Sequence, residues 1–460
     1  MRKHNHTIMF KPSCDCNLNC KYCYDRPMRE RFKGQRASRE ILEHTAKLMS
    51  EYAENVQWYW HGGEPTLLGK DFYYEAQDVF AENYTSNFKQ ALQTNGILPM
   101  KDRGWIDTVK DCGIGMGFSF DLYGQSERLG NSTNIVEEYE NMLEEFKNRG
   151  ARKNVESVTV ITNKTISKMV GTYEHFKARF GKDYVMSLLL VFEIDEDNPS
   201  GLGITEEDYI KYYPKYLNHL LHDTSEDALI DRYVYTYLVR LVGEDKTSAC
   251  GFIECRRKWL AVHPDGTVTH CDREPGVYYD LGNIMDYNSI EEIYESEAYK
   301  RFEDDCEERL NNYCRKCNFY DICNGGCHSN HGSVNGTRVN KVNKRECYTV
   351  QQNIISVYDM LQNMKNRKDY NQALLNLLRG ERIILPIEIS QYLETKGYTY
   401  DSYINVADYR EDTSLFTEHI AYKLFRLFNL NRPKGNVKLH EQLETLFNTY
   451  QSTIHDWLKG

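Results

Sequence analysis

The sequence has no run that approaches eighteen apolar residues, so it lacks a segment able to cross a membrane as a helix. Its first residues, MRKHNHTIMFKPSCDC, lack the apolar centre of a secretory signal peptide. Positive charge is not in excess, because the net charge is −11, and this argues against a nucleic-acid-binding surface. We therefore expect a cytoplasmic protein whose partners include neither a membrane nor a nucleic acid.

Cysteine, by contrast, is abundant, with 14 in the chain. The cytosol keeps thiols reduced, so disulfide bonds are not expected. The cysteines gather in two groups, residues 14–23 and 250–347, and only Cys112 lies outside both. Clustered cysteines in a cytosolic chain indicate metal binding.

Short β-rich runs alternate with helix-like segments through the first half of the chain, whose 460 residues suffice for two or three domains. The expected strands are residues 7–10, 56–60, 89–94, 114–120, 155–161 and 184–192. The expected helices are residues 38–55 (with Ser38 as N-cap), 70–84, 134–150 and 165–180. This alternation predicts parallel βαβ units in a doubly wound sheet, a barrel or a partial barrel. In each of these folds the functional residues lie at the C-terminal ends of the strands.

The second half of the chain has a different pattern. A helical connector is expected over residues 205–245, where Thr205 and Asp208 form a capping-box-like start. Residues 250–347 show little regular periodicity, as expected where metal replaces a hydrophobic core. After residue 350 the pattern is helical again, in segments 353–366, 419–430 and 442–458, but no motif there indicates a role.

The stretch CDCNLNCKYCY, residues 14–24, contains a C-x3-C-x2-C motif formed by Cys16, Cys20 and Cys23. Three cysteines ligate three irons of a [4Fe–4S] cluster and leave the fourth iron open. The spacing alone also allows a zinc knuckle with Cys14 as the fourth ligand. The motif resembles that of the radical S-adenosylmethionine (SAM) superfamily, in which the open iron binds the amino and carboxyl groups of SAM. This resemblance implies that Tyr22 lies beside the adenine, although alone it could equally be a core residue.

Further segments match the family at the ends of successive strands. WHGGEPTL, QTNG and FSFDLYG follow the second, third and fourth expected strands. The resemblance implies that these segments line SAM, through Gly62, Gly63, Glu64, Thr94, Asn95, Ser119 and Asp121. Arg128 is a candidate for the family's carboxylate-binding arginine, but the sequence lacks the usual neighbouring histidine, and a solvated surface arginine is an equal alternative. Asn163, after the fifth strand, is a weaker match that could mark a turn.

The second cysteine group resembles the SPASM extension of radical SAM enzymes, which carries two auxiliary [4Fe–4S] clusters. By order in the sequence, the resemblance assigns Cys250, Cys255, Cys271 and Cys327 to auxiliary cluster one. It assigns Cys314, Cys317, Cys323 and Cys347 to auxiliary cluster two. With four cysteines each, neither cluster has an open iron, and this suits electron transfer. Cys14, Cys112 and Cys306 are left as non-ligands.

The resemblance also implies a fold: a partial (β/α)6 barrel in residues 1–225, linker helices and a SPASM domain in 226–350, and an α-helical extension in 351–460. No leader-binding domain is expected before the first strand. In related anaerobic sulfatase-maturating enzymes, the aspartate after the third auxiliary cysteine, here Asp272, takes the substrate's proton. A capping or hydrogen-bonding aspartate is the plain alternative.

The family's chemistry implies a function. A reduced flavodoxin or ferredoxin-type donor supplies an electron, SAM is cleaved to a 5′-deoxyadenosyl radical, and the substrate is oxidised by two electrons. Our leading hypothesis is a maturase that crosslinks side chains of a ribosomally made precursor peptide. Anaerobic sulfatase maturation, which converts Cys or Ser to formylglycine, is the second hypothesis. A metal-stabilised binding module without catalysis is the third.

Overall fold

The computed structural model describes residues 3–81, 86–129, 135–152, 155–191, 200–223, 225, 227–234, 236, 255–273, 280–317, 320–330, 333–334, 337–338, 347, 350, 382–384 and 403–405. Cys250 therefore lies outside the described residues. The expected helices after residue 350 also lie outside them. In that part of the chain two short strands are described, β12 (Arg382–Ile384) and β13 (Tyr403–Asn405), which pair antiparallel.

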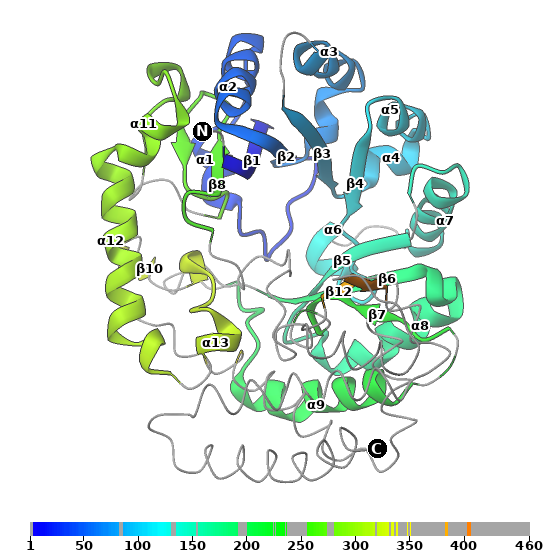
Figure 1. Ribbon diagram of the computed structural model, residues 1–460. Coiled ribbons are helices and arrows are strands. Elements are labelled where there is room, and N and C mark those ends of the chain that lie inside the picture. Colours follow the sequence, from blue (N-terminus) through cyan, green and yellow to red (C-terminus); the bar gives the residue numbers. More distant parts are fainter. Residues whose placement is uncertain are drawn as a thin grey trace, which may run out of the picture.

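The first four strands are parallel neighbours in one sheet: β1 (Lys3–Ser13), β2 (Ala53–Gly62), β3 (Asn87–Thr94) and β4 (Ile114–Phe118). A second sheet holds β5 (Val155–Ile161), β6 (Tyr184–Leu190) and β7 (Ile230–Asp231). A parallel bridge between Ser119 and Val158 joins the end of β4 to β5. The six strands β1 to β6 thus follow one curved course, and helices lie along its outer side (Figure 1). This arrangement confirms the predicted partial barrel.

The helices of the barrel connect these strands in the order that the sequence predicts. They are α1 (Arg26–Arg31), α2 (Arg39–Tyr52), α3 (Asp71–Ala81), α4 (Ile97–Lys101), α5 (Trp105–Asp111), α6 (Gln125–Leu129), α7 (Val136–Asn148) and α8 (Met169–Phe180), followed by the connector α9 (Glu206–His222). The Ser38 side chain accepts a hydrogen bond from the amide of Ile41, and Thr205 accepts one from the amide of Asp208. Both predicted N-caps are therefore confirmed.

Aromatic side chains fill the space between the sheet and its helices. The core includes four aromatic side chains that are fully buried: Phe10, Trp58, Trp60 and Tyr73. The ring centroids of Phe10 and Trp58 are 5.2 Å apart. The four side chains come from alternate positions of β1 and β2 and from α3, so the period-2 pattern of the strands points these rings to one face. This core fixes the strand ends that carry the predicted site residues.

The cysteine-rich region is more regular than its sequence predicts. Its strand β8 (Trp259–Val262) adds to the free edge of the barrel sheet, parallel to β1, and β9 (Val268–Thr269) pairs antiparallel with β8. The helices are α11 (Ile290–Glu295), α12 (Glu297–Asn312) and α13 (Tyr320–Cys323), and a small hairpin joins β10 (Ser333–Val334) to β11 (Thr337–Arg338).

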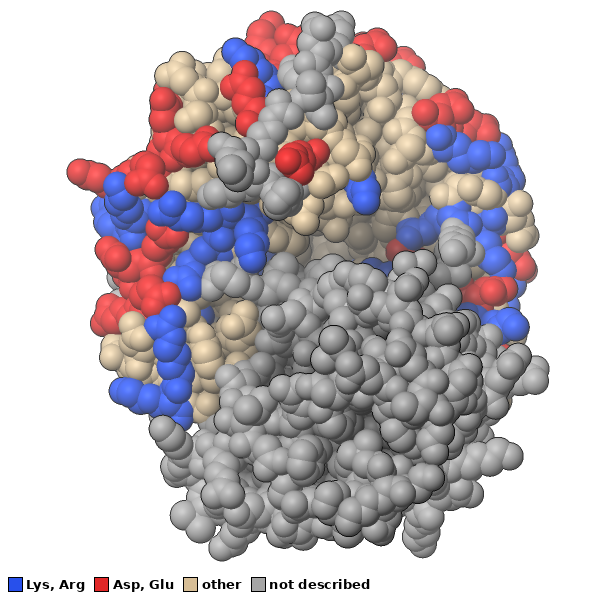
Figure 2. Space-filling view, viewed as in Figure 1, with Lys and Arg blue, Asp and Glu red and all other residues tan. Residues whose placement is uncertain are grey.

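The expectation that metal replaces the hydrophobic core here is wrong for α11 and α12. Ile290, Ile293, Tyr294, Tyr299 and Phe302 are all buried and belong to the same core cluster as the barrel. The apolar positions are spaced as on one helical face, but the many charges of α12 mask them in the sequence. Basic and acidic side chains alternate along the edge of the molecule where α12 lies (Figure 2). In the part of the chain that the structure describes, no helix is long and apolar enough to cross a membrane.

Candidate functional site

Cys16, Cys20 and Cys23 lie in the loop between β1 and α1, at the C-terminal end of the first strand. Their thiols interact electrostatically with one another, and burial raises the pKa of Cys20 to about 11, opposed by the nearby charge of Arg128. Two of these sulfurs have an N–H donor nearby. The amide of Leu18 lies 3.4 Å from Cys16 Sγ, and an Arg29 guanidinium nitrogen lies 3.9 Å from Cys23 Sγ. Such donors stabilise thiolates, so this loop fits an anionic iron–sulfur cluster.

Cys14 has different surroundings from the other three cysteines of the motif. It is 0% exposed and packs with Met28 and Phe32 in a small apolar cluster. Burial raises the pKa of its thiol to about 12, against the opposing charge of Lys11. This environment suits a small apolar residue and agrees with its predicted role as a non-ligand.

Gly62 and Gly63, at the end of β2, press against the cysteine loop itself. A Cβ atom at Gly63 would lie 2.2 Å from the carbonyl oxygen of Asp15, and one at Gly62 would lie 2.2 Å from that of Ser13. Gly62 also has a φ of 125°, which favours glycine. The sequence suggested that these glycines admit a ligand. In the structure they first allow two backbones to touch, which fixes the loop that carries Cys16.

Glu64 ties the ends of β2 and β3 together. Its buried carboxylate accepts hydrogen bonds from the Thr94 hydroxyl at 2.7 Å and the Asn95 amide at 2.7 Å, and from both the amide and the hydroxyl of Thr66. Burial raises the pKa of this carboxyl, and these hydrogen bonds oppose the shift. Asn95 in turn places its side-chain nitrogen 3.8 Å from Cys16 Sγ. The three predicted strand-end residues therefore converge on the cysteine loop.

Asp121, after β4, joins Tyr22 to the barrel. Its carboxylate accepts a hydrogen bond from the Tyr22 hydroxyl and one from the amide of Val160 at 2.7 Å. Burial raises the pKa of Asp121, and the charge of Arg128 opposes this. Ser119 accepts a hydrogen bond from the Gln93 side chain at 2.9 Å. These contacts bring Tyr22 and Asp121 together, and their predicted places beside SAM stay predictions.

Arg128 is 5% exposed, so it is not the solvated surface arginine that the sequence allowed. One guanidinium nitrogen donates to the carbonyl oxygen of Asn95 at 2.7 Å. Its positive charge also acts on Cys20 and Asp121. Arg128 thus lies with the other candidates for SAM binding.

Asn163 is not brought into contact with the cysteine loop. Its side chain donates to the carbonyl oxygen of Gly201 at 3.0 Å, and its amide donates to that of Leu202 at 3.0 Å. These bonds hold the segment that precedes α9. For Asn163 the structure therefore favours the turn-like interpretation.

The thiols predicted for the two auxiliary clusters fall into the two expected groups. The pKa of Cys271 is raised by burial, then by Asp272, and then by the neighbouring thiols of Cys327 and Cys255. For Cys323, burial raises the pKa to about 12, and the neighbouring thiols that add to the shift are Cys347, Cys314 and Cys317. The structure thus gathers the described members of each predicted ligand set.

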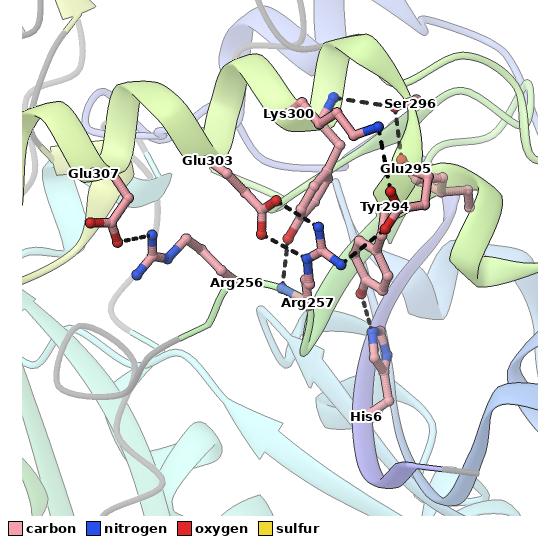
Figure 3. A network of polar contacts seen from close by, with 11 residues as sticks. His6, Arg256, Arg257, Tyr294, Glu295, Ser296, Lys300, Glu303 and Glu307 are labelled. Atoms are coloured by element: carbon pink, nitrogen blue, oxygen red, sulfur yellow. Dashed lines mark hydrogen bonds and ion pairs between the residues drawn. The ribbon is translucent and has the colours of Figure 1, made fainter. Parts of the chain in front are cut away.

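A network of arginines anchors the loop after Cys255 to α12 (Figure 3). The Arg257 guanidinium binds both carboxylate oxygens of Glu303 at 2.8 Å, and its amide donates to the Tyr299 hydroxyl at 2.6 Å. Arg256 donates to Glu307 at 2.6 Å. These consecutive contacts fix the position of Cys255 relative to the helix.

Asp272 lies in a buried polar cluster made by three parts of the chain. The Tyr24 hydroxyl donates to its Oδ2 at 2.7 Å, and His61 Nδ1 lies 3.5 Å from the same atom. Lys11 donates to the Asp272 backbone oxygen at 3.1 Å and forms a 2.5 Å ion pair with Asp25. Burial alone would raise the pKa of Asp272. The charge of His61, then that of Lys11, and the Tyr24 hydrogen bond outweigh burial, so the pKa lies below its usual value.

Sequence reasoning missed three residues of this cluster. Tyr24 directly follows the last cysteine of the motif and His61 lies inside WHGGEPTL, so their positions gave a signal that could have been used. Lys11 gave none, because its role depends on a contact with a residue 261 positions away. His61 Nδ1 is buried without a hydrogen bond, which marks it as a group aimed at the site.

No three or more His, Cys, Asp or Glu side chains among the described residues converge tightly enough for one metal ion. The ligands of an iron–sulfur cluster bind different irons and are spaced more widely than the ligands of a single ion. Residues 10–176 match the Radical SAM superfamily, and residues 250–318 match SPASM, an iron-sulfur cluster-binding domain.

The chain carries a radical SAM domain followed by a SPASM domain. It is 25% identical over 334 residues, 70% of this chain and 88% of the relative, to a cysteine-type anaerobic sulfatase-maturating enzyme of Clostridium perfringens. A structure of anSMEcpe with bound AdoMet is 24% identical and covers 81% of this chain and 98% of its own, with a TM-score of 0.65. SuiB of Streptococcus suis bound to precursor peptide SuiA is 14% identical and covers 71% of this chain and 72% of its own, with a TM-score of 0.52. Both structures share the fold.

The family match confirms the predicted class, a radical SAM/SPASM enzyme, and its cofactors, SAM and [4Fe–4S] clusters. It decides against the zinc knuckle and against a binding module without catalysis. The assignment of individual residues to each cofactor stays a prediction. The thiols and N–H donors described above fit that assignment.

Proposed function

We propose that this radical SAM/SPASM enzyme oxidises a side chain of a peptide by two electrons. The observation that carries the proposal is the buried group of polar side chains around Asp272. Tyr24 comes from the predicted SAM-cluster loop, His61 from the end of β2, and Asp272 itself follows the auxiliary ligand Cys271. The proposed proton acceptor thus lies where the loop of the SAM-binding cluster meets the region of the auxiliary clusters.

Each cofactor has proposed ligands in this chain. Cys16, Cys20 and Cys23 would hold the SAM-binding cluster, and the two sets of auxiliary cysteines would hold the other two. When bound, SAM and these clusters supply hydrogen-atom abstraction and an acceptor for the second electron.

The protein supplies the proton acceptor. The Asp272 carboxylate would take the proton at Oδ2. Tyr24 holds that oxygen in place, and Lys11 fixes the backbone of the same residue.

Our first choice of substrate is a ribosomally made precursor peptide, with a crosslink between side chains as the product. The sulfatase-maturating relative is matched over 88% of its length but only 70% of this chain. The structure of anSMEcpe is matched over 98% of its length and 81% of this chain, so part of this chain lies outside both matches. SuiB, which shares the fold, is described with a bound precursor peptide.

Sulfatase maturation is the second candidate, and a specific observation favours it. The 25% identity to the cysteine-type enzyme of Clostridium perfringens extends over nearly all of that enzyme. The carboxylate after Cys271 serves either product, because both reactions remove one hydrogen atom, one electron and one proton.

The test is a product-mass assay with the anaerobically reconstituted enzyme, SAM and a reductant. It is offered short peptides encoded beside its gene and, separately, a sulfatase-type Cys-x-Pro-x-Arg peptide. Loss of two hydrogens from a neighbouring peptide, at residues that become linked, supports the crosslinking maturase. Conversion of the sulfatase-type peptide to an aldehyde supports the second candidate instead.

The role of Asp272 is tested separately by Asp272→Asn, with Tyr24→Phe as the partner variant. We expect SAM cleavage to persist in Asp272→Asn, while product formation falls by roughly 10²–10⁴-fold. Tyr24→Phe should have a smaller effect, because it removes an orienting hydrogen bond and keeps the acceptor. Unchanged product formation in Asp272→Asn would leave Asp272 as a structural residue only.

A further inference from the structure

Arg309, on the last turn of α12, is a buried charge that has no carboxylate partner among the residues that the structure describes. It is 3% exposed. Its guanidinium donates to the Gly325 carbonyl oxygen at 2.7 Å and to His328 Nδ1 at 2.8 Å, and lies 3.3 Å from Cys314 Sγ. Its Nε is buried without a hydrogen bond. No Asp or Glu among the described residues is a partner of this guanidinium. A guanidinium also stays protonated in a protein, so Arg309 keeps its positive charge.

Burying such a cation is costly unless an anion compensates it. Among the described contacts of Arg309, the group that can carry negative charge is the thiol of Cys314. Its sulfur lies 3.3 Å from a guanidinium nitrogen, within reach of a charge-assisted hydrogen bond to a thiolate. Cys314 belongs to the set proposed for auxiliary cluster two, whose four thiolates would make the cluster anionic. The surroundings of Arg309 therefore fit an anionic cluster better than they fit free thiols.

The position of Arg309 also relates it to both auxiliary clusters. Gly325 lies in the turn between Cys323 and Cys327, where Asn324, Gly325 and Gly326 all have positive φ. That turn carries the chain from one proposed ligand set to the other. Because a guanidinium only donates, His328 must accept at Nδ1, and this residue directly follows Cys327. One side chain thus contacts a ligand of cluster two and the turn that leads to cluster one.

We infer that Arg309 balances the charge of auxiliary cluster two and donates a hydrogen bond to its ligand Cys314, which raises the reduction potential of that cluster. Hydrogen bonds to cluster sulfurs and nearby charge are among the factors that set such potentials. Arg309 is a positioning residue in this role, because it acts through the cluster and touches no substrate. The inference rests on the proposed cysteine ligands, but not on which peptide is the substrate.

The test is a redox titration of the full-length, reconstituted protein, monitored by electron paramagnetic resonance. The variants are Arg309→Gln, which removes the charge, and Arg309→Lys, which keeps it. Arg301→Gln is the matched control, because Arg301 lies on the same helix and its side chain is exposed. A Cys317→Ala/Cys323→Ala variant identifies the signal of cluster two by its loss. Iron and sulfide content is measured for every variant.

We expect Arg309→Gln to shift the midpoint potential of the cluster-two signal to more negative values, with a smaller shift for cluster one. Arg309→Lys should stay near the wild-type value, and the control Arg301→Gln should not move it. An unchanged potential in a fully loaded Arg309→Gln variant would overturn the inference. Equal shifts in the Gln and Lys variants would also overturn it, because shape would then matter and charge would not.

If Arg309→Gln fails to retain cluster two, the Lys variant decides. A Lys variant that keeps the cluster at a near wild-type potential supports the requirement for charge. A Lys variant that also loses the cluster shows that the contact with the Gly325 turn is what matters, and this contradicts the inference. The peptide assays are independent of these outcomes, so failure here leaves the proposed function standing.

Discussion

The two halves of this enzyme hold their cysteines by different means. In the barrel region (described residues 3–236) the cysteine loop is held by backbone contacts with Gly62 and Gly63 and by the buried carboxylate of Glu64. In the auxiliary region (described residues 255–350) the ligand loops are held by side-chain ion pairs on α12 and by the buried charge of Arg309. The barrel site thus depends on packing that needs no metal. The auxiliary sites depend on charged side chains, one of which, Arg309, an anionic cluster would balance.

The largest expected effect separates two cysteines of the same loop. Cys16→Ala should abolish SAM cleavage, because it removes a proposed ligand of the SAM-binding cluster. Cys14→Ala should retain SAM cleavage, because Cys14 is buried against Met28 and Phe32. The measurement is 5′-deoxyadenosine formation under reducing conditions, with iron content as the control. Loss of cleavage and of iron in Cys14→Ala would contradict the assignment of Cys14 as a non-ligand.

Removal of the clusters should affect the two regions unequally. We expect amide hydrogen exchange in cluster-free protein to rise roughly tenfold or more for residues 314–330, since metal binding there contributes to folding. Strands β2 and β3 should keep their protection, because their core does not depend on metal. Exchange is measured by mass spectrometry before and after chelation. Equal deprotection of both regions would contradict the contrast drawn above.

Gly63→Ala tests the backbone contact that fixes the barrel site. The new Cβ would meet the carbonyl oxygens of Asp15 and Cys14, so we expect a loss of roughly 1–3 kcal/mol in unfolding free energy. The content of the SAM-binding cluster should fall with it. Gly115→Ala is the control, because its Cβ would lie at an ordinary 3.6 Å from the Gln90 carbonyl oxygen. Denaturant titration of both variants measures the difference, and equal stability would remove the argument for close approach.

The barrel and its strand-end residues could be predicted because their signals are local. Each strand is an apolar run, and each motif follows its strand directly, so order along the chain gives position in the fold. The cluster ligands were grouped by the resemblance to SPASM enzymes, from the order of the cysteines, and this grouping stays a prediction. The capping residues Ser38 and Thr205 are likewise defined within one helical turn.

What could not be predicted depends on contacts between distant segments. The addition of β8 to β1 pairs Thr7 with Trp259, and nothing in either segment specifies the other. Lys11 reads as an ordinary charged residue until Asp25 and Asp272 are placed beside it. Arg309 sits among the charges of α12, and only its burial distinguishes it from its exposed neighbours. Burial of a charge is a property of the fold, so the sequence cannot show it.

Asp231, at the end of the barrel region, tests whether burial raises the pKa of a carboxyl group in this fold. Burial raises its pKa to about 6, and the Tyr216 hydroxyl donates to it at 2.5 Å. The folded protein therefore holds a proton that the unfolded chain releases near pH 4, so stability falls as the pH rises from about 4 to about 6. The change amounts to at most roughly 2–3 kcal/mol.

Asp231→Asn should remove this part of the pH dependence, because the amide does not titrate. The measurement is the difference in unfolding free energy between variant and wild type at pH 4 and at pH 6.5, so that other carboxyl groups cancel. A difference that does not change with pH would show that Asp231 titrates normally in the folded protein.

The smallest expected effect concerns the ion pairs of the auxiliary region. The side chains of Arg257 and Glu303 are 37% and 23% exposed, so water and salt screen their attraction. A double-mutant cycle of Arg257→Gln and Glu303→Gln in the reconstituted protein should give a coupling of about 0.2–1 kcal/mol, and less in high salt. Pairs this weak position the loop after Cys255, and cluster ligation would hold it more firmly. A coupling several times larger that persists in high salt would mean that α12 organises the ligand loop before any metal binds. The auxiliary region would then resemble the barrel region, and the difference between them would lie only in the kind of contact.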